Sequence, residues 1–238
     1  MPAVLVHGVP DTAEVWQPVL DHLSRADTVT LALPGFGTSM PASFGATKDD
    51  YAAWIVGRLE EIGEPVDLVG HDWGSIFVQY VGSGHPGLVR TWCASDGAID
   101  VDYVWHDLAQ AWQAPEVGKQ VMEAMEGAAV VDGLRAAGHP DAAGAATRVD
   151  ETMKGAILTL YRSAVHVGAE WQPTVERNER PALVLWGSDD PYAPAEPFAR
   201  RLAERVHGEL VILEGGHWAM FEHPEETARA LERFWEGA

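Results

Sequence analysis

The chain has 238 residues, 47% of them hydrophobic and 22% charged, which is a composition typical of globular proteins. Its 36 Asp and Glu outnumber its 16 Lys and Arg, and the resulting net charge of −20 disfavours binding to nucleic acid or to an anionic membrane surface. The single cysteine, Cys93, excludes an intramolecular disulfide. Together with the lack of a secretory signal and of a membrane-spanning apolar run, it indicates a cytoplasmic protein.

Short apolar runs alternate with segments of helical periodicity along most of the chain. Continuous runs, typical of strands covered on both faces, occur at 3–6, 28–33, 66–70, 89–94, 182–187 and 209–214. Helices are predicted between them near 14–25, 47–62, 74–85, 194–206 and 224–236. This alternation predicts an α/β fold with a mostly parallel sheet of about six strands and helices on both faces.

The alternation is interrupted once, between residues 97 and 178. Only helix-like segments occur there, at 101–126, 128–138 and 149–167. The insertion follows the carboxyl end of a strand, where ligands bind in parallel sheets. We therefore expect a core domain made of 1–96 and 179–238, and a helical cap, or lid, made of 97–178.

One motif joins a predicted strand to a predicted helix. In Gly70-His71-Asp72-Trp73-Gly74, two glycines flank an acid at the spacing of a nucleophile elbow. The glycines permit a sharp turn that projects the side chain of Asp72 above the sheet, and the start of the following helix favours a negative charge there. We interpret Asp72 as a nucleophile.

Three further motifs follow other predicted strands. They are His7-Gly8-Val9-Pro10 after the first strand, Gly187-Ser188-Asp189-Asp190 after the fifth and Gly215-Gly216-His217-Trp218 after the last. Since parallel strands end at one edge of the sheet, these motifs are expected to meet the elbow there. The chain order of nucleophile, acid and histidine is that of the α/β hydrolases.

These motifs resemble the Asp-nucleophile branch of the α/β-hydrolase superfamily, which includes epoxide hydrolases and haloalkane dehalogenases, and the resemblance covers essentially the whole chain. It implies an α/β-hydrolase fold and a covalent alkyl ester on Asp72. Water activated by His217, which Asp190 orients, would hydrolyse this ester. Backbone N–H groups of Val9 and Trp73 would form the oxyanion hole.

Two positions leave alternatives open. Some haloalkane dehalogenases place the acid after the preceding strand, which would nominate Asp96 instead of Asp190. Family members also carry a strand hairpin before the His-Gly motif, whereas this motif begins here at His7. We expect the sheet to lack these edge strands, so that its open edge must be covered, shortened or paired in a homodimer.

A carboxylate nucleophile limits the substrates to epoxides, alkyl halides and similar electrophiles. Tyr161 lies in a segment that resembles the Tyr-Arg segment of the epoxide hydrolase cap, which implies that it donates a proton to the epoxide oxygen. At the position of the family's second cap tyrosine the chain has Leu108, with Tyr103 and His106 as nearby candidates. We therefore expect an epoxide hydrolase acting on a small apolar or aromatic electrophile.

A haloalkane dehalogenase is the first alternative, because Trp73 and a cap tryptophan, Trp105 or Trp112, could bind a halide through two N–H groups. A non-catalytic ligand receptor on the same fold is the second. The expected substrate-binding side chains are Trp105, Trp112, Tyr103, His106 and Trp218. We expect no metal and no cofactor, since no metal-ligand cluster, phosphate loop or nucleotide fingerprint occurs.

Overall fold

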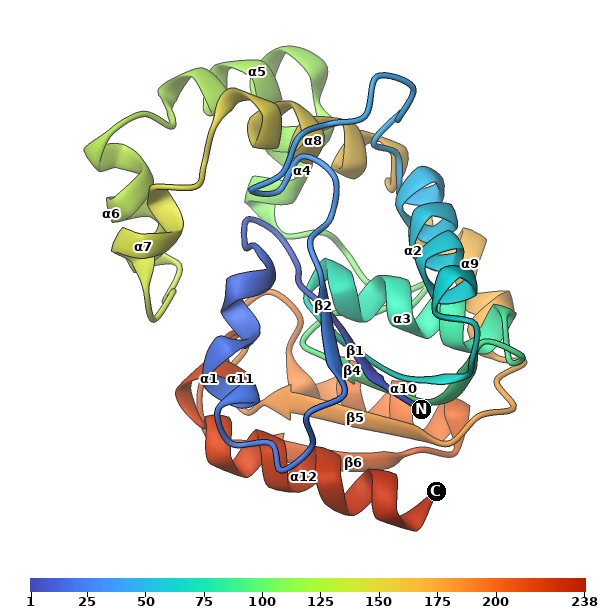
Figure 1. Cartoon of the computed structure of the whole chain (residues 1–238). Helices are drawn as coiled ribbons and strands as arrows, with labels where there is room; N and C mark the ends of the chain where they lie inside the picture. The colour runs from blue at the N-terminus through green and yellow to red at the C-terminus, as the bar shows by residue number, and fades with distance from the viewer.

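The computed structural model describes residues 1–238 and contains a six-stranded parallel sheet in the order β2-β1-β3-β4-β5-β6 (Figure 1). Its strands are β1 (Ala3–Val6), β2 (Thr28–Leu31), β3 (Val66–His71), β4 (Val89–Ser95), β5 (Ala182–Gly187) and β6 (Glu209–Leu213). Each strand begins at the residue that the sequence predicts. The expectation of a parallel sheet of about six strands is confirmed.

Helices cover both faces of the sheet, because successive strand residues point into two separate hydrophobic layers. Val4 and Val6 of β1 belong to the layer that contains α2 (Lys48–Ile62), α3 (Trp73–Gly84) and α10 (Arg200–Val206). Ala3 and Leu5 belong to the opposite layer, which contains η1 (Ala13–Trp16), α1 (Gln17–Leu20), α11 (Ala219–Glu222) and α12 (Pro224–Gly237). No helix is both long and apolar enough to cross a membrane.

Two of the predicted core helices are shorter or less regular than the sequence suggests. The predicted helix 14–25 ends at Leu20, and the backbone N–H of Ser24 donates to Glu232 of α12 (2.6 Å) instead of continuing a helical turn. The predicted helix 194–206 begins as an irregular turn, η2 (Ala195–Ala199), that contains Pro197 and leads into α10.

The segment between β4 and β5, which we call the helical insertion (97–178), contains no strand. Its helices are α4 (Asp107–Gln113), α5 (Pro115–Ala124), α6 (Ala128–Ala136), α7 (Ala142–Ala146), α8 (Glu151–Ser163) and α9 (Val167–Val175). The single helix predicted over 101–126 is wrong: it begins only at Asp107 and is broken at Ala114, which is extended because Pro115 follows it. In Figure 1, α4 to α8 lie together to one side of the sheet.

The outer strand β2 is the short, half-exposed edge of the sheet. It has four residues and pairs only with β1, and the side chain of Val29 is 39% exposed. The predicted open edge is therefore present and short. That a second copy pairs with it remains a prediction.

A buried ionic cluster fixes the amino end of β3. Asp67 is fully buried, and its carboxylate accepts hydrogen bonds from the guanidinium groups of Arg90 (2.7 and 2.8 Å) and Arg25 (2.9 Å) and from the hydroxyl of Thr91 (2.8 Å). Both oxygens of the carboxylate are thereby satisfied, which a buried charge requires. The cluster joins β3 to β4 and to the segment before β2.

Candidate active site

The elbow between β3 and α3 holds Asp72 in an unusual backbone conformation. Its φ of 53° and ψ of −118° lie outside the regions that residues with side chains ordinarily adopt. The backbone N–H of Asp72 donates to the carbonyl of Ser95 at the end of β4 (2.9 Å). At Gly74 a Cβ atom would lie 2.2 Å from the carbonyl oxygen of Val6, so only glycine lets α3 begin this close to β1.

The structure brings Asp72, His217 and Asp190 together at the carboxyl ends of β3, β6 and β5. Nε2 of His217 lies 3.3 Å from Oδ2 of Asp72, and Nδ1 lies 3.0 Å from Oδ2 of Asp190. The other oxygen of Asp190 accepts hydrogen bonds from the backbone N–H groups of Tyr192 (2.8 Å) and Ala193 (3.2 Å). The imidazole thus bridges two carboxylates. Asp190, which two backbone N–H groups hold in place, orients it.

The loop after β1 contacts Oδ1 of Asp72, the carboxylate oxygen that does not face His217. The backbone N–H of Val9 donates to Oδ1 of Asp72 (2.6 Å), which is the contact an oxyanion-hole donor makes. A Cβ atom at Gly8 would lie 2.2 Å from that same oxygen, so glycine is required for the approach. No hydrogen bond joins the N–H of Trp73 to this carboxylate, and its part in the oxyanion hole stays a prediction.

The two carboxylates dominate the electrostatics of His217. Burial alone would lower the pKa of its imidazole, but the charges and hydrogen bonds of Asp190 and Asp72 raise that pKa well above the usual 6.5. Because one of these charges is that of Asp72, any reaction that neutralises this carboxylate removes part of the effect.

Asp96, the alternative acid, lies beside the site without contacting His217. Its Oδ1 accepts the backbone N–H of Gly187 (2.8 Å) and its Oδ2 interacts with the hydroxyl of Ser95 (2.6 Å). Burial and the neighbouring charge of Asp190 raise the pKa of Asp96 to about 8, so it is mostly protonated at neutral pH. The geometry therefore gives the orienting contact to Asp190.

A cavity of about 230 Å³, which we call the reaction cavity, lies above Asp72 and His217. Most of its lining is apolar and comes from the helical insertion, including Trp112, Val121, Met125, Val130 and Leu134. The insertion therefore covers Asp72 and supplies most of the surface that a bound molecule would contact.

Tyr161 of α8 lines this cavity together with Asp72. Its side chain is 3% exposed, and its ring packs against the rings of Trp73 (5.3 Å between centroids) and Trp112 (4.8 Å). Burial and then the charge of Asp72 raise the pKa of the phenol well above 10. Tyr161 consequently remains protonated and can donate a hydrogen bond.

The predicted tryptophans differ in what their indole N–H groups can do. The N–H of Trp105 donates to the carbonyl of Ala164 (3.2 Å), which leaves it no free donor for a halide. The N–H groups of Trp73 and Trp112 are buried without a hydrogen-bond partner. The N–H of Trp218 donates to Oδ2 of Asp11 (2.9 Å), although its ring lines the reaction cavity.

Leu108, at the position of the family's second cap tyrosine, and the nearby Tyr103 and His106 differ in their contacts. The hydroxyl of Tyr103 donates to the carbonyl of Tyr192 (2.9 Å), and Nδ1 of His106 accepts the N–H of Ala109 (3.3 Å) at the start of α4. Leu108 lines the reaction cavity. His106 therefore lines the reaction cavity, whereas Tyr103 does not, and the hydroxyl of Tyr103 is engaged by Tyr192.

Sequence reasoning missed Tyr192, which lines the reaction cavity and packs edge-on against the imidazole of His217 at 5.1 Å. The sequence feature that could have indicated it is an aromatic residue directly after Asp190-Pro191, close to the end of a predicted strand. No group of three His, Cys, Asp or Glu side chains in the chain is placed to hold a metal ion.

The parallel sheet, the strained elbow and the bridging histidine together define an α/β hydrolase. A model of the alpha/beta hydrolase family matches residues 3–230, and the chain belongs to this family. The fold expected from the sequence is thereby confirmed, as is membership of the superfamily that contains epoxide hydrolases and haloalkane dehalogenases.

Relatives of known name include several hydrolases. The chain is 25% identical to (E)-2-((N-methylformamido)methylene)succinate hydrolase of Acinetobacter baylyi, over 99% of this chain and 90% of that protein. It is 40% identical to epoxide hydrolase 3 of Siraitia grosvenorii, but over 37% of this chain and 29% of that protein. The structure of haloalkane dehalogenase DbeA from Bradyrhizobium elkani matches with a TM-score of 0.78 at 20% identity, covering 100% of this chain and 92% of that one.

Proposed function

We propose that this chain hydrolyses epoxides to vicinal diols through an ester of Asp72. The observation that carries the proposal is the pairing, in one cavity, of a carboxylate nucleophile with a buried, protonated phenol, Tyr161. A carboxylate that attacks an amide or ester forms a reactive anhydride, which reverts. At a strained sp³ carbon it forms a stable alkyl ester instead, and a phenol supplies the proton that the opened ring needs.

In the first step, an oxygen of Asp72 forms a bond to one epoxide carbon while the bond from that carbon to the ring oxygen breaks. The electron pair passes to the ring oxygen, which takes a proton from Tyr161. Val9 holds Oδ1, so the attack comes from Oδ2, whose neighbour is Nε2 of His217 at 3.3 Å. The raised pKa of Tyr161 makes its phenolate strongly basic, so the proton is recovered from the imidazolium or from water.

In the second step, water attacks the ester carbonyl carbon. Ester formation has removed the charge of Asp72, so the pKa of His217 falls and its neutral imidazole can accept the proton of the water. The tetrahedral oxyanion forms at the oxygen that Val9 contacts. Collapse of this intermediate breaks the bond to the alkoxide oxygen of the product, which takes the proton from the imidazolium and leaves as the diol. The carboxylic acid left on Asp72 then gives its proton to the imidazole.

The lining and size of the reaction cavity favour a small apolar substrate. Twelve of the 17 side chains that line it are hydrophobic, and no Lys or Arg is among them to bind a carboxylate or phosphate. In the middle of α6, Gly133 lines the cavity, and a Cβ atom there would have no neighbour within 4 Å. The size of the cavity suits an epoxide that carries a phenyl group or a short alkyl chain.

The test uses the variant His217→Gln, which should form the ester and hydrolyse it slowly. The protein is exposed to styrene oxide, and the adduct is measured by intact mass and located by peptide mapping. We expect the mass of a whole epoxide on Asp72. Asp72→Ala in the same background is the control and should gain no mass, and an adduct elsewhere, or none, would contradict the proposal.

Halide displacement is the second candidate, because the N–H groups of Trp73 and Trp112 lie unpartnered near Tyr161. The same His217→Gln variant is exposed to 1-bromobutane. A butyl ester on Asp72 without bromine, and no adduct from styrene oxide, would favour a haloalkane dehalogenase. No adduct from either reagent would favour a ligand receptor.

A further inference from the structure

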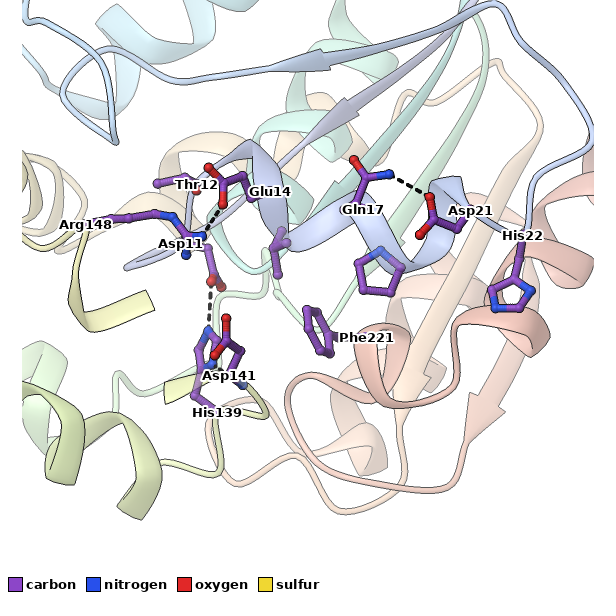
Figure 2. A pocket seen from close by; sticks show the side chains of 12 residues that line it. Asp11, Thr12, Glu14, Gln17, Asp21, His22, His139, Asp141, Arg148 and Phe221 are labelled. Atoms are coloured by element: carbon purple, nitrogen blue, oxygen red, sulfur yellow. Dashed lines mark hydrogen bonds and ion pairs between the residues drawn. The ribbon is translucent and has the colours of Figure 1, made fainter. Parts of the chain in front are cut away.

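Asp11, directly after the His7-Gly8-Val9-Pro10 motif, is a buried carboxylate that the proposed mechanism does not use. It is 4% exposed, and each of its oxygens accepts one side-chain hydrogen bond. Oδ1 accepts from Nε2 of His139 (2.9 Å), a bond drawn in Figure 2, and Oδ2 accepts from the indole N–H of Trp218 (2.9 Å). Asp11 thus joins the loop after β1, the loop after β6 and the helical insertion.

The contact with Trp218 reaches the catalytic histidine. The indole ring packs perpendicular to the imidazole of His217, with 4.8 Å between centroids. The backbone of His217 is held separately, because Nε2 of His71 donates to its carbonyl (2.7 Å), and burial lowers the pKa of His71 to about 4 and keeps it neutral. The orientation of the imidazole ring is set by the bond from Asp190 and by the rings packed against it, which are those of Trp218, Tyr192 and His71.

The contact with His139 comes from the insertion. Nδ1 of His139 accepts the backbone N–H of Asp141 (3.0 Å), so Nε2 carries the hydrogen that Asp11 accepts. The ring of His139 also packs against Trp218 at 4.8 Å. Burial would raise the pKa of Asp11, but the hydrogen bonds from His139 and Trp218 hold that pKa below its usual value.

A second ion pair between the insertion and the core lies nearby. Arg148 contacts Glu14 of η1, and both residues line, with Asp11 and His139, a groove of about 600 Å³ on the outside of the molecule (Figure 2). Glu14 makes no bond to Trp218. The two contacts hold the same part of the insertion, 139–148, but only one of them leads to the active site.

We propose that Asp11 is a positioning residue, which orients His217 for ester hydrolysis through Trp218 and makes that orientation depend on the docking of residues 139–148. The inference rests on the proposed two-step function. Ester formation uses Asp72, held by its own elbow and by Val9, whereas ester hydrolysis uses His217. Disturbing Asp11 should therefore slow the second step and spare the first.

The experiment follows a single turnover of styrene oxide by rapid quench and intact mass, in the wild type and in Asp11→Asn. Asparagine presents an N–H₂ group to one of the two donors and so loses one bond. We expect ester formation within about twofold of the wild type and ester hydrolysis slowed by about 10 to 100-fold, the effect of displacing a catalytic group by about 1 Å. In steady state kcat and KM should fall together, with kcat/KM unchanged.

Four variants separate the path through Trp218 from a general loosening of the insertion. Trp218→Phe removes the indole N–H together with the five-membered ring that carries it, and it should slow hydrolysis at least as much as Asp11→Asn, with no further loss when Asp11→Asn is added. His139→Leu should also slow hydrolysis, and His139→Gln, which keeps a donor near Nε2, should partly restore it. Glu14→Gln, which breaks the neighbouring ion pair, should leave both steps within about twofold.

Three results would overturn the inference: equal losses in both steps, unchanged hydrolysis in Asp11→Asn and Trp218→Phe, or an equal effect of Glu14→Gln. If wild-type protein forms no ester, the proposed function has failed, and NMR titration of the ligand-free protein tests the inference alone. Asp11→Asn should then shift the chemical shifts and the pKa of His217, and Glu14→Gln should not. Unchanged His217 signals in Asp11→Asn would reject it.

Discussion

Two aspartates at opposite ends of β3, one within the strand and one in the turn directly after it, show how one residue type takes on opposite tasks. Asp67, at the amino end, is buried with hydrogen bonds from two arginines and a threonine. Asp72, at the carboxyl end, has a strained backbone, one backbone N–H, and a histidine at 3.3 Å, and it lines a cavity.

The difference lies in what surrounds each carboxylate. At Asp67 the charge is fully paired, so the residue contributes to stability and has no free lone pair for chemistry. At Asp72 the strained turn directs the side chain into the cavity, where its carboxylate contacts the N–H of Val9 and the imidazole of His217. Stability and reactivity are thereby separated between the start of β3 and the turn that follows it.

The largest expected effect is that of Asp72→Ala on activity. Turnover of styrene oxide should fall by at least about 10⁴-fold, because the covalent path is lost. The free energy of unfolding in urea should stay within about 1 kcal/mol of the wild type, since the residue is strained rather than stabilising. Substantial residual turnover by purified variant would contradict the role of Asp72.

The converse change is Asp67→Ala. It leaves Arg25 and Arg90 buried in part without their acid, and breaking such a cluster typically costs about 3–5 kcal/mol. Urea denaturation measures this loss, and the activity per folded molecule should be unchanged at a temperature where the variant is folded. A stability equal to that of the wild type would show that the cluster is not a stabilising element.

Tyr161→Phe tests whether the phenol beside Asp72 donates the proton in ester formation. Removal of the phenol should slow ester formation from styrene oxide at least tenfold, about 1.4 kcal/mol in activation free energy. Ester formation from 1-bromobutane, if the chain carries it out, should change little, because bromide needs no proton. Equal losses with both reagents, measured by rapid quench, would remove the proton-donor role.

Asp96 is intermediate between the two aspartates, since it is buried like Asp67 and has a positive φ of 55° like Asp72. Its pKa is about 8 in the folded protein, against about 4 in the unfolded chain. Between these values the unfolded chain releases the proton that the folded protein keeps, so Asp96 lowers the free energy of unfolding as the pH rises from about 4 to 8.

Asp96→Asn, which mimics the protonated acid, should remove this decline in the free energy of unfolding with rising pH. Relative to the wild type, the variant should be nearly equal in stability at pH 5 and more stable at pH 9 by at least about 1 kcal/mol. Urea denaturation at the two pH values measures the difference. A constant difference at both would mean that Asp96 ionises normally.

There is a physical reason why the sequence predicts both the sheet and the proximity of Asp72, Asp190 and His217. Continuous apolar runs mark buried parallel strands, and parallel topology brings their carboxyl ends together wherever the motifs lie in the chain. The bridging geometry of His217 then follows from loops of a few residues.

Features that depend on packing across distant segments could not be predicted in this way. No local pattern reveals that Asp11 meets His139, that Tyr192 turns toward His217, or that Trp105 bonds to a carbonyl rather than facing the cavity. The break at Pro115 was readable in principle, since a proline disfavours helix at the residue before it.

The position of the helical insertion in the chain has a consequence for folding. Strand β5 pairs with β4 through Trp92 and Ala182, so this pairing must close the loop formed by the entire insertion. Loop closure costs entropy, and long-range parallel pairing slows folding. During synthesis the segment with Asp72 emerges first and waits with β4 unpaired on one side, until the segments with Asp190 and His217 complete the sheet. We therefore expect that no truncated chain lacking β6 is active, and that β4 is the aggregation-prone surface of the nascent protein.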